Sequence, residues 1–131
     1  MSSNEIMIAR ANATAEYLAI FFQLADEWQL SIEEQKGLIG VKSIERLLQS
    51  LDRGGSLILN DESISKLVML SGIRRDLNSL YSTDAECLSF IRSPCSDFDG
   101  LSPLLFMFKG NSLENIASLQ FQLKKRLMLN N

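Results

Sequence analysis

The segment from residue 16 to residue 40 reads EYLAIFFQLADEWQLSIEEQKGLIG, and it carries the pattern of two helices joined by a short turn. Its first apolar positions recur at intervals of four, three and four residues, which is the spacing of one face of an α-helix. These positions are Tyr17, Phe21, Leu24 and Trp28. We therefore expect an amphipathic helix over residues 16–28 that buries one broad face.

The second helix of this segment begins with a capping box. The Ser31 hydroxyl can accept a hydrogen bond from the amide three residues later, while the Glu34 carboxylate reaches back to the Ser31 amide. Gly40 readily adopts the left-handed conformation that ends many helices. These signals predict a short helix between Ser31 and Gly40.

Similar start signals recur along the rest of the chain. The expected N-caps are Ser43, Asn60 or Asp61, Thr83, Ser102 and Asn111. Residues 54–55 are a Gly-Gly stop, residues 57–59 fit an extended connector, and residues 93–101 are expected to form a loop. About seven helices and no convincing strand predict an all-α fold.

Apolar stripes on three of these helices are expected to face the core. The first comprises Ile44, Leu47, Leu48 and Leu51, the second Ile64, Leu67, Val68, Ile73, Leu77, Leu80 and Tyr81, and the third Leu113, Ile116, Ala117, Gln120, Leu123 and Leu127. Gly72 interrupts the second stripe at a cost of about 1 kcal/mol relative to alanine in a continuous helix. We expect a kink or a close helix crossing at Gly72.

Length and composition are those of one small globular domain. The 131 residues are 46% hydrophobic and 22% charged, and we expect a helix-turn-helix-like region over residues 1–55 packed with residues 56–131 as one compact unit. No segment approaches the apolar length of a membrane span. Cys87 and Cys95 lack metal-binding or disulfide-scaffold spacing, so we expect a soluble protein of the reducing cytoplasm.

The chain contains no histidine. This excludes Ser-His-Asp and Cys-His nucleophiles and an imidazole base. Asp97 and Asp99 are too few for a metal site and fit solvated loop positions. We therefore expect no enzymatic activity, no metal and no cofactor.

Residues 90–110, FIRSPCSDFDGLSPLLFMFKG, carry a second pattern. It resembles the toxin-binding signature of the Xre/MbcA/ParS antitoxin family, in which Trp-Leu-Arg-x-Pro-Asn is followed by glycine, Ser/Thr-Pro-Leu and a second glycine. The residues that match in order are Arg92, Pro94, Gly100, Ser102, Pro103, Leu104 and Gly110. Phe90 stands where the family has tryptophan, and Cys95 where it has asparagine.

Residues 30–40, LSIEEQKGLIG, are similar to a helix of the degenerate helix-turn-helix with which this family commonly begins. The resemblance extends from Ala15 to near Arg126. It implies the antitoxin of a type II toxin-antitoxin pair, which binds a RES-domain toxin, an enzyme that destroys NAD, and occludes its active site.

The segment 123–129, LKKRLML, is the best candidate for partner contact, because a small domain cannot bury all the apolar residues that flank its three cations. The proposed partner-binding residues are Arg92, Lys124, Lys125 and Arg126, with Ser102 and Phe106 secondary. Alternatively, the three cations only stabilise the negative end of the last helix. Arg92 could likewise bind helix-terminal carbonyls or a carboxylate instead of a partner.

A DNA-binding autorepressor is the alternative function. A helix-turn-helix would place residues 43–50 in the major groove, with Lys42, Arg46 and Gln49 available to promoter DNA. Glu45 opposes this approach, and residues 1–54 carry five basic against eight acidic side chains, a net charge of −3.

A homodimer is expected from the short helix after Ser102. Phe106 and Phe108 lie about 200° apart around a helix, so one of them, with Leu105 or Met107, is expected to be exposed. Two copies would then pair through this helix or through the N-terminal helices.

Overall fold

The computed structural model describes the backbone of residues 3–52 and 59–129 and the side chains of residues 13–49 and 59–129. Within these residues the chain forms seven α-helices, one 3-10 turn and no strand, which confirms the all-α prediction. The helices are α1 (Ser3–Glu27), α2 (Ile32–Ile39), α3 (Ile44–Asp52), α4 (Asp61–Leu80), α5 (Asp84–Arg92), α6 (Pro103–Phe108) and α7 (Ser112–Leu129), with the 3-10 turn η1 (Ser96–Phe98) before α6. None of the described helices is both long and apolar enough to cross a membrane.

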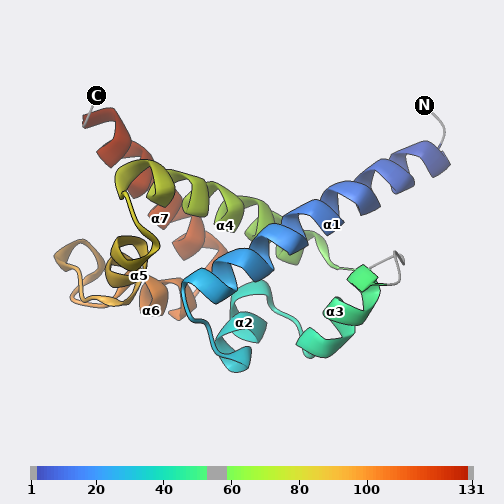
Figure 1. Cartoon of the computed structure of the whole chain (residues 1–131), viewed down its shortest axis with the longest axis horizontal. Coiled ribbons are helices and arrows are strands. Elements are labelled where there is room, and N and C mark those ends of the chain that lie inside the picture. Colours follow the sequence, from blue (N-terminus) through green and yellow to red (C-terminus); the bar gives the residue numbers. More distant parts are fainter. Residues whose placement is uncertain (1–2, 53–58, 130–131) are drawn as a thin grey trace.

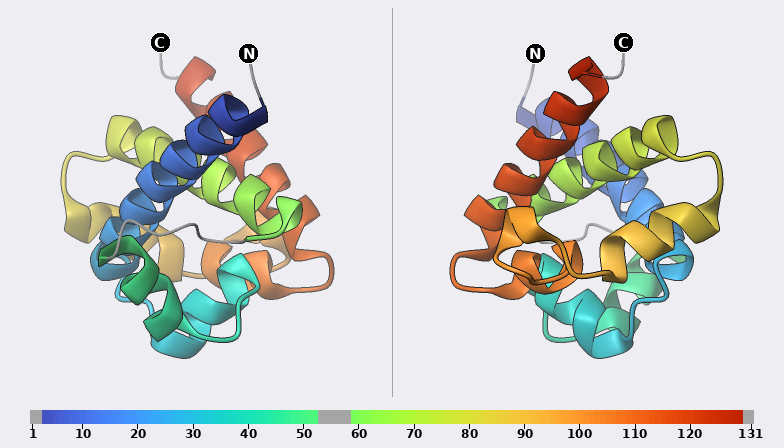
Figure 2. Two further views of the ribbon diagram at one scale, coloured as in Figure 1. Left: turned by 90° about the vertical axis from the view of Figure 1, so that its right-hand side faces the viewer. Right: turned by 90° about the vertical axis from the view of Figure 1, so that its left-hand side faces the viewer.

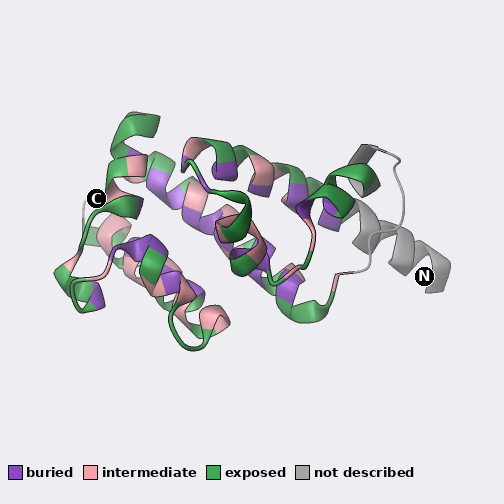
Figure 3. Ribbon diagram, turned by 90° about the horizontal axis from the view of Figure 1, so that it is seen from below, coloured by how far each residue is buried: buried purple, intermediate pink, exposed green. Residues whose placement is uncertain are grey.

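Helix α4 is the central element. It packs along α7 and is crossed by α1, while α2 and α5 also contact it (Figure 1). The three long helices gather on one side of the molecule, and the shorter α2, α3, α5 and α6 lie on the other (Figure 2). Buried positions face inward from several helices and exposed positions cover the outside (Figure 3).

The predicted helix caps form. The Glu34 amide donates to Ser31 Oγ at 3.0 Å and the Ser31 amide donates to Glu34 Oε1 at 2.9 Å, which confirms the capping box of α2. Gly40 ends this helix in the left-handed conformation, with φ of 71°. Asn60 caps α4, and Thr83 caps α5. The Glu86 amide donates to the Thr83 hydroxyl oxygen, and this hydroxyl donates in turn to the Glu86 carboxylate.

Helix α1 begins at Ser3, well before the predicted start at residue 16. Residues 3–15 lack a four-three apolar spacing but include four alanines, the residue with the highest helix propensity. Intrinsic propensity thus extends the helix where the hydrophobic pattern gives no signal. The 25 residues of α1 span roughly 37 Å.

The core is one cluster of buried apolar side chains to which all seven described helices contribute. Helix α3 supplies Ile44 and Leu47, and α5 supplies Cys87 and Ile91. Two predicted core residues, Leu48 and Val68, are exposed, and Ala117 is exposed as well. Leu70 and Leu119 are fully buried instead. The reason in α4 is geometric, because the helix packs between α1 and α7, and Val68 points outside the arc that they cover.

Gly72 marks a close crossing and not an interruption. Helix α4 continues through it, and a Cβ atom at Gly72 would overlap the side-chain amide of Gln120 in α7. The predicted crossing is therefore confirmed. The Gly-Gly stop at 54–55, positions 57–58 of the apolar run and the side chain of Leu51 lie outside the described residues.

Helix α6 corrects one expectation about its phenylalanines. Phe106 and Phe108 are both half-buried, whereas the sequence predicts one exposed ring. Phe106 stacks on Phe98 with ring centroids 4.6 Å apart, and Phe108 packs against Gly37 of α2. The exposed apolar side chain is Leu105, with 56% of its surface accessible, while Met107 is buried.

Candidate partner-binding surface

Arg92 ends α5 and connects it to the corner between α1 and α2. Its Nε donates to the carbonyl of Trp28 at 3.1 Å, and its Nη2 donates to the carbonyl of Gln29 at 2.7 Å. The same Nη2 lies 3.1 Å from Glu34 Oε1. The guanidinium therefore has a structural role, while 37% of the side chain stays accessible to a partner.

Glu34 joins this cluster to the capping box of α2. Burial acts to raise the pKa of its carboxyl, but hydrogen bonds from the Ser31 amide and from Arg92 outweigh burial. The pKa of Glu34 consequently lies below its ordinary value of 4.5. Its carboxylate is thus stabilised by both the helix cap and Arg92.

Arg126 fixes the end of α7 to the loop of residues 93–101. Its Nη2 lies 3.1 Å from Asp97 Oδ2 and 3.9 Å from Cys95 Sγ, and its guanidinium lies 5.1 Å from the centre of the Phe90 ring. Burial opposes the charge, but the hydrogen bonds to Asp97 and Cys95 raise the pKa of Arg126 overall. Phe90 and Cys95, the two positions at which residues 90–110 differ from the signature that they resemble, therefore both contact this arginine.

The outer face of α7 is both apolar and cationic. Phe121 is 62% exposed and Met128 is 76% exposed, and Lys124 and Lys125 are exposed beside them. The Lys125 ammonium lies 5.8 Å from the centre of the Phe121 ring, within the range of a cation–π contact. We call these four residues the outer stripe of α7.

Sequence reasoning identified the two lysines of this stripe and included Met128 in the candidate segment 123–129, but it did not identify Phe121. Phe121, Lys125 and Met128 are spaced by four and three residues, so they share one helix face. That face lies opposite the buried face of α7. The four-three spacing of these residues is the sequence signal that could have identified Phe121. Next to the stripe, Leu80, Tyr81, Arg126 and Leu129 line a pocket of about 230 Å³ between the ends of α4 and α7.

The two secondary candidates have structural contacts. Ser102 is buried, and its hydroxyl accepts a hydrogen bond from the Leu105 amide at 3.1 Å, which caps α6. Pro103 follows in the first turn, as predicted. Phe106 is stacked on Phe98.

The DNA-binding candidates lie on or just before α3. Lys42, Arg46 and Gln49 are all exposed. Glu45 and Leu48 are exposed on the same short helix, and Leu48 lines a groove of about 400 Å³ between α2 and α3. The face therefore mixes cations with a carboxylate and an apolar side chain.

The acidic and thiol side chains of the described part of the chain were candidates for a metal site. No group of three or more His, Cys, Asp or Glu side chains there is arranged to hold a metal ion. Burial raises the pKa of the Cys87 thiol, with nearby carboxylates adding to the effect, so this thiol stays protonated at neutral pH. Asp97 is engaged by Arg126.

Comparison with known proteins gives one relative. No protein-family model and no solved structure matches this chain. The uncharacterized protein y4oB of Sinorhizobium fredii is 29% identical to it over 97 residues, which is 74% of each chain.

Proposed function

We propose that this protein is the cytoplasmic antitoxin of a type II toxin-antitoxin pair, and that it binds a RES-domain enzyme and occludes its NAD site. The resemblance of residues 90–110 to the Xre/MbcA/ParS signature supports this function. The protein itself needs no metal, cofactor or catalytic residue for this role, because occlusion is steric and electrostatic.

The observation that carries the proposal is the way in which Arg126 fixes α7. Its contacts with Asp97 of the 93–101 loop and with Phe90 of α5 hold the helix to residues 90–97, and Lys124 and Lys125 stay exposed on the outer face. A helix that is already ordered loses little entropy on binding. Its apolar residues would enter a groove of the enzyme, and its lysines would steer it toward an acidic rim.

Affinity capture from the native cells tests this proposal. The tagged wild-type protein should recover an enzyme that consumes NAD, and the variant Lys124→Glu/Lys125→Glu should lose it. Arg126 is left unchanged because its removal would also release the loop. Lys42→Glu/Arg46→Glu is the matched control, since it reverses the same number of charges on α3 and should retain the enzyme. Equal capture by all three proteins would contradict the proposed surface.

Promoter binding is a second candidate function, favoured by the exposure of Lys42 just before α3 and of Arg46 and Gln49 on α3, the helix that follows α2. Fluorescence anisotropy with the protein's own promoter would detect it. Binding should weaken steeply with salt and be lost in Lys42→Glu/Arg46→Glu but not in Lys124→Glu/Lys125→Glu. The opposite pattern would exclude α3 as the DNA-binding element.

We also propose that the protein forms a homodimer, because Leu105 on α6 and Leu48 on α3 are exposed apolar side chains. Sedimentation velocity at micromolar concentration should show a dimer. Loss of the dimer in Leu105→Glu would assign the interface to α6, and loss in Leu48→Glu would assign it to the N-terminal helices. A wild-type monomer would contradict the proposal.

A further inference from the structure

A groove of about 400 Å³ lies between α2 and α3. Helix α3 is at the edge of the molecule, and α2 is the helix that it contacts most among those described (Figure 1). The groove is therefore open to a partner. Its lining includes Ile32 and Lys36 from α2, Lys42 from the joint before α3, and Ile44, Glu45 and Leu48 from α3.

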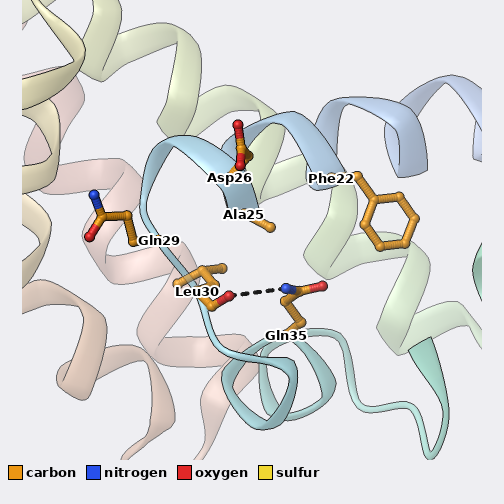
Figure 4. Close-up of a pocket in the computed structure, with 6 residues that line it drawn as sticks. All are labelled: Phe22, Ala25, Asp26, Gln29, Leu30 and Gln35. Carbon is orange, nitrogen blue, oxygen red and sulfur yellow. Dashed lines mark hydrogen bonds between the residues drawn. The ribbon is translucent and has the colours of Figure 1, made fainter. Parts of the chain in front are cut away.

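The pocket between α1 and α2 has no comparable arrangement. Its volume is about 320 Å³, and Figure 4 shows the side chains of Asp26 and Gln29 directed away from those of Phe22 and Gln35. Asp26 and Gln29 are also exposed. The polar groups of this pocket therefore do not converge on one partner.

The apolar lining of the groove between α2 and α3 is partly buried and partly exposed. Ile44 has only 4% of its surface accessible, whereas Ile32 is 56% and Leu48 is 45% exposed. A single exposed apolar side chain is ordinary, but two that line one groove form a surface suited to a protein contact. The same surface thus offers a projecting leucine and a hollow beside it.

Two opposite charges of the groove lack partners. Within the residues that the structure describes, neither the Lys42 ammonium nor the Glu45 carboxylate takes part in an ion pair. Lys36 is different, because its ammonium lies 3.1 Å from Oε1 of Glu33. The unpaired charges of the lining are thus one cation and one anion, and they sum to zero.

A surface with these properties is complementary to a second copy of itself. In a two-fold symmetric contact every residue pair occurs twice, with the two copies exchanged. Lys42 of each copy can then meet Glu45 of the other, so that neither charge stays unpaired. A partner with an excess of one sign would instead place a like charge beside one of these two residues.

We propose that the groove between α2 and α3 is the interface of a two-fold symmetric homodimer. Leu48 of each copy enters the groove of the other beside Ile32, and Lys42 pairs with Glu45 of the second copy. This inference rests on the homodimer proposed above, and it assigns the interface to α2 and α3 instead of α6. Because the dimer covers Lys42 and one face of α3, dimerisation and promoter contact through α3 would compete for the same surface.

Charge reversal followed by mixing tests the reciprocal pairing. Sedimentation velocity at micromolar concentration should show a dimer for the wild type. Lys42→Glu and Glu45→Lys should each weaken the dimer about tenfold or more, because two ion pairs become two repulsive contacts. An equimolar mixture of the two variants should form a heterodimer, since each contact then joins an acidic to a basic side chain. Labelling one variant with ¹⁵N lets native mass spectrometry distinguish the heterodimer from both homodimers.

Lys109→Glu is the matched control, because it reverses one exposed charge at the end of α6 and should leave the dimer unchanged. Loss of the dimer in this control would place the interface at α6 and overturn the inference. A dimer that survives both Lys42→Glu and Glu45→Lys, or a mixture of these variants that stays monomeric, would also overturn it without contradicting the homodimer itself.

A monomeric wild type would contradict both the homodimer and its interface. If that monomer captured the NAD-consuming enzyme and Leu48→Glu abolished the capture, the groove would bind the enzyme and not a second copy. Formation of the heterodimer also shows that both charge variants are folded, so loss of either homodimer alone cannot be attributed to misfolding.

Discussion

Nη2 of Arg92 lies 3.1 Å from Oε1 of Glu34, a residue 58 positions earlier in the chain. Through this contact Arg92, the last residue of α5, is bound to the capping box of α2. The same guanidinium binds the carbonyls of Trp28 and Gln29 after α1. Arg92 therefore organises the fold on which the candidate partner surface depends.

Replacing Arg92 by alanine should lower the free energy of unfolding by about 1–2 kcal/mol, because charge-assisted hydrogen bonds to two carbonyls are lost at a partly exposed site. Urea denaturation measures this change. The unfolding free energy of Arg92→Lys should lie between those of the wild type and Arg92→Ala, since an ammonium group cannot donate to several acceptors in one plane as a guanidinium does. Lys42→Ala, an exposed control, should change stability by less than about 0.5 kcal/mol. If Arg92→Ala changed the unfolding free energy as little as Lys42→Ala does, the structural role of Arg92 would be contradicted.

Stability should depend on the ionisation of Glu34. The pKa of its carboxyl is lowered in the folded protein. The stabilisation is therefore complete above pH 4.5, the ordinary pKa of the group, and is lost as the pH falls through the lower pKa of the folded state. Glu34→Gln should be less stable than the wild type by about 1 kcal/mol at pH 7, and the difference should shrink in acid. Unfolding free energies measured from pH 7 to pH 3 check this. Parallel curves for the two proteins would contradict it.

Gly72 and Gln120 should be energetically coupled across the α4–α7 crossing. Alanine at an interior glycine of a helix normally adds about 1 kcal/mol of stability, but here its methyl group overlaps the Gln120 amide. We expect little gain from Gly72→Ala in the wild type and the full gain in a Gln120→Ala background. A double-mutant cycle measures the coupling, and additive effects would exclude it.

Gly37→Ala should be destabilising, although the glycine is within α2. Its Cβ would lie 2.8 Å from Cε1 of Phe108, and overpacking of this kind costs about 1–3 kcal/mol. Phe108→Leu should remove most of this cost in the double variant. Chemical denaturation of the four proteins tests the prediction. Stabilisation by Gly37→Ala alone would show that the ring moves aside freely.

Local signals made much of the fold predictable. The capping box of Ser31 and Glu34, the Asn60 cap and the start of α6 at Ser102 and Pro103 depend on residues within one helical turn, so their spacing is visible in the sequence. The exception is the start of α1, where helix propensity acts without an apolar period.

Long-range packing was not predictable in the same way. Val68 and Leu70 are both apolar and only two positions apart, yet only Leu70 is buried, because α1 and α7 cover one arc of α4. The contact of Arg126 with Asp97 spans 29 residues. Sequence spacing therefore indicated a cationic last helix but not that Arg126 is anchored while Lys124 and Lys125 face outward.

The most direct test of the proposed function is the cellular NAD level during co-expression with the RES-domain enzyme recovered by capture. The wild-type protein should preserve NAD, and Lys42→Glu/Arg46→Glu should preserve it equally. Lys124→Glu/Lys125→Glu should let NAD fall, although its folded stability is unchanged by circular dichroism. Full protection by the α7 variant would contradict the outer stripe as the contact surface, and failure of the wild type to protect would contradict the antitoxin function itself.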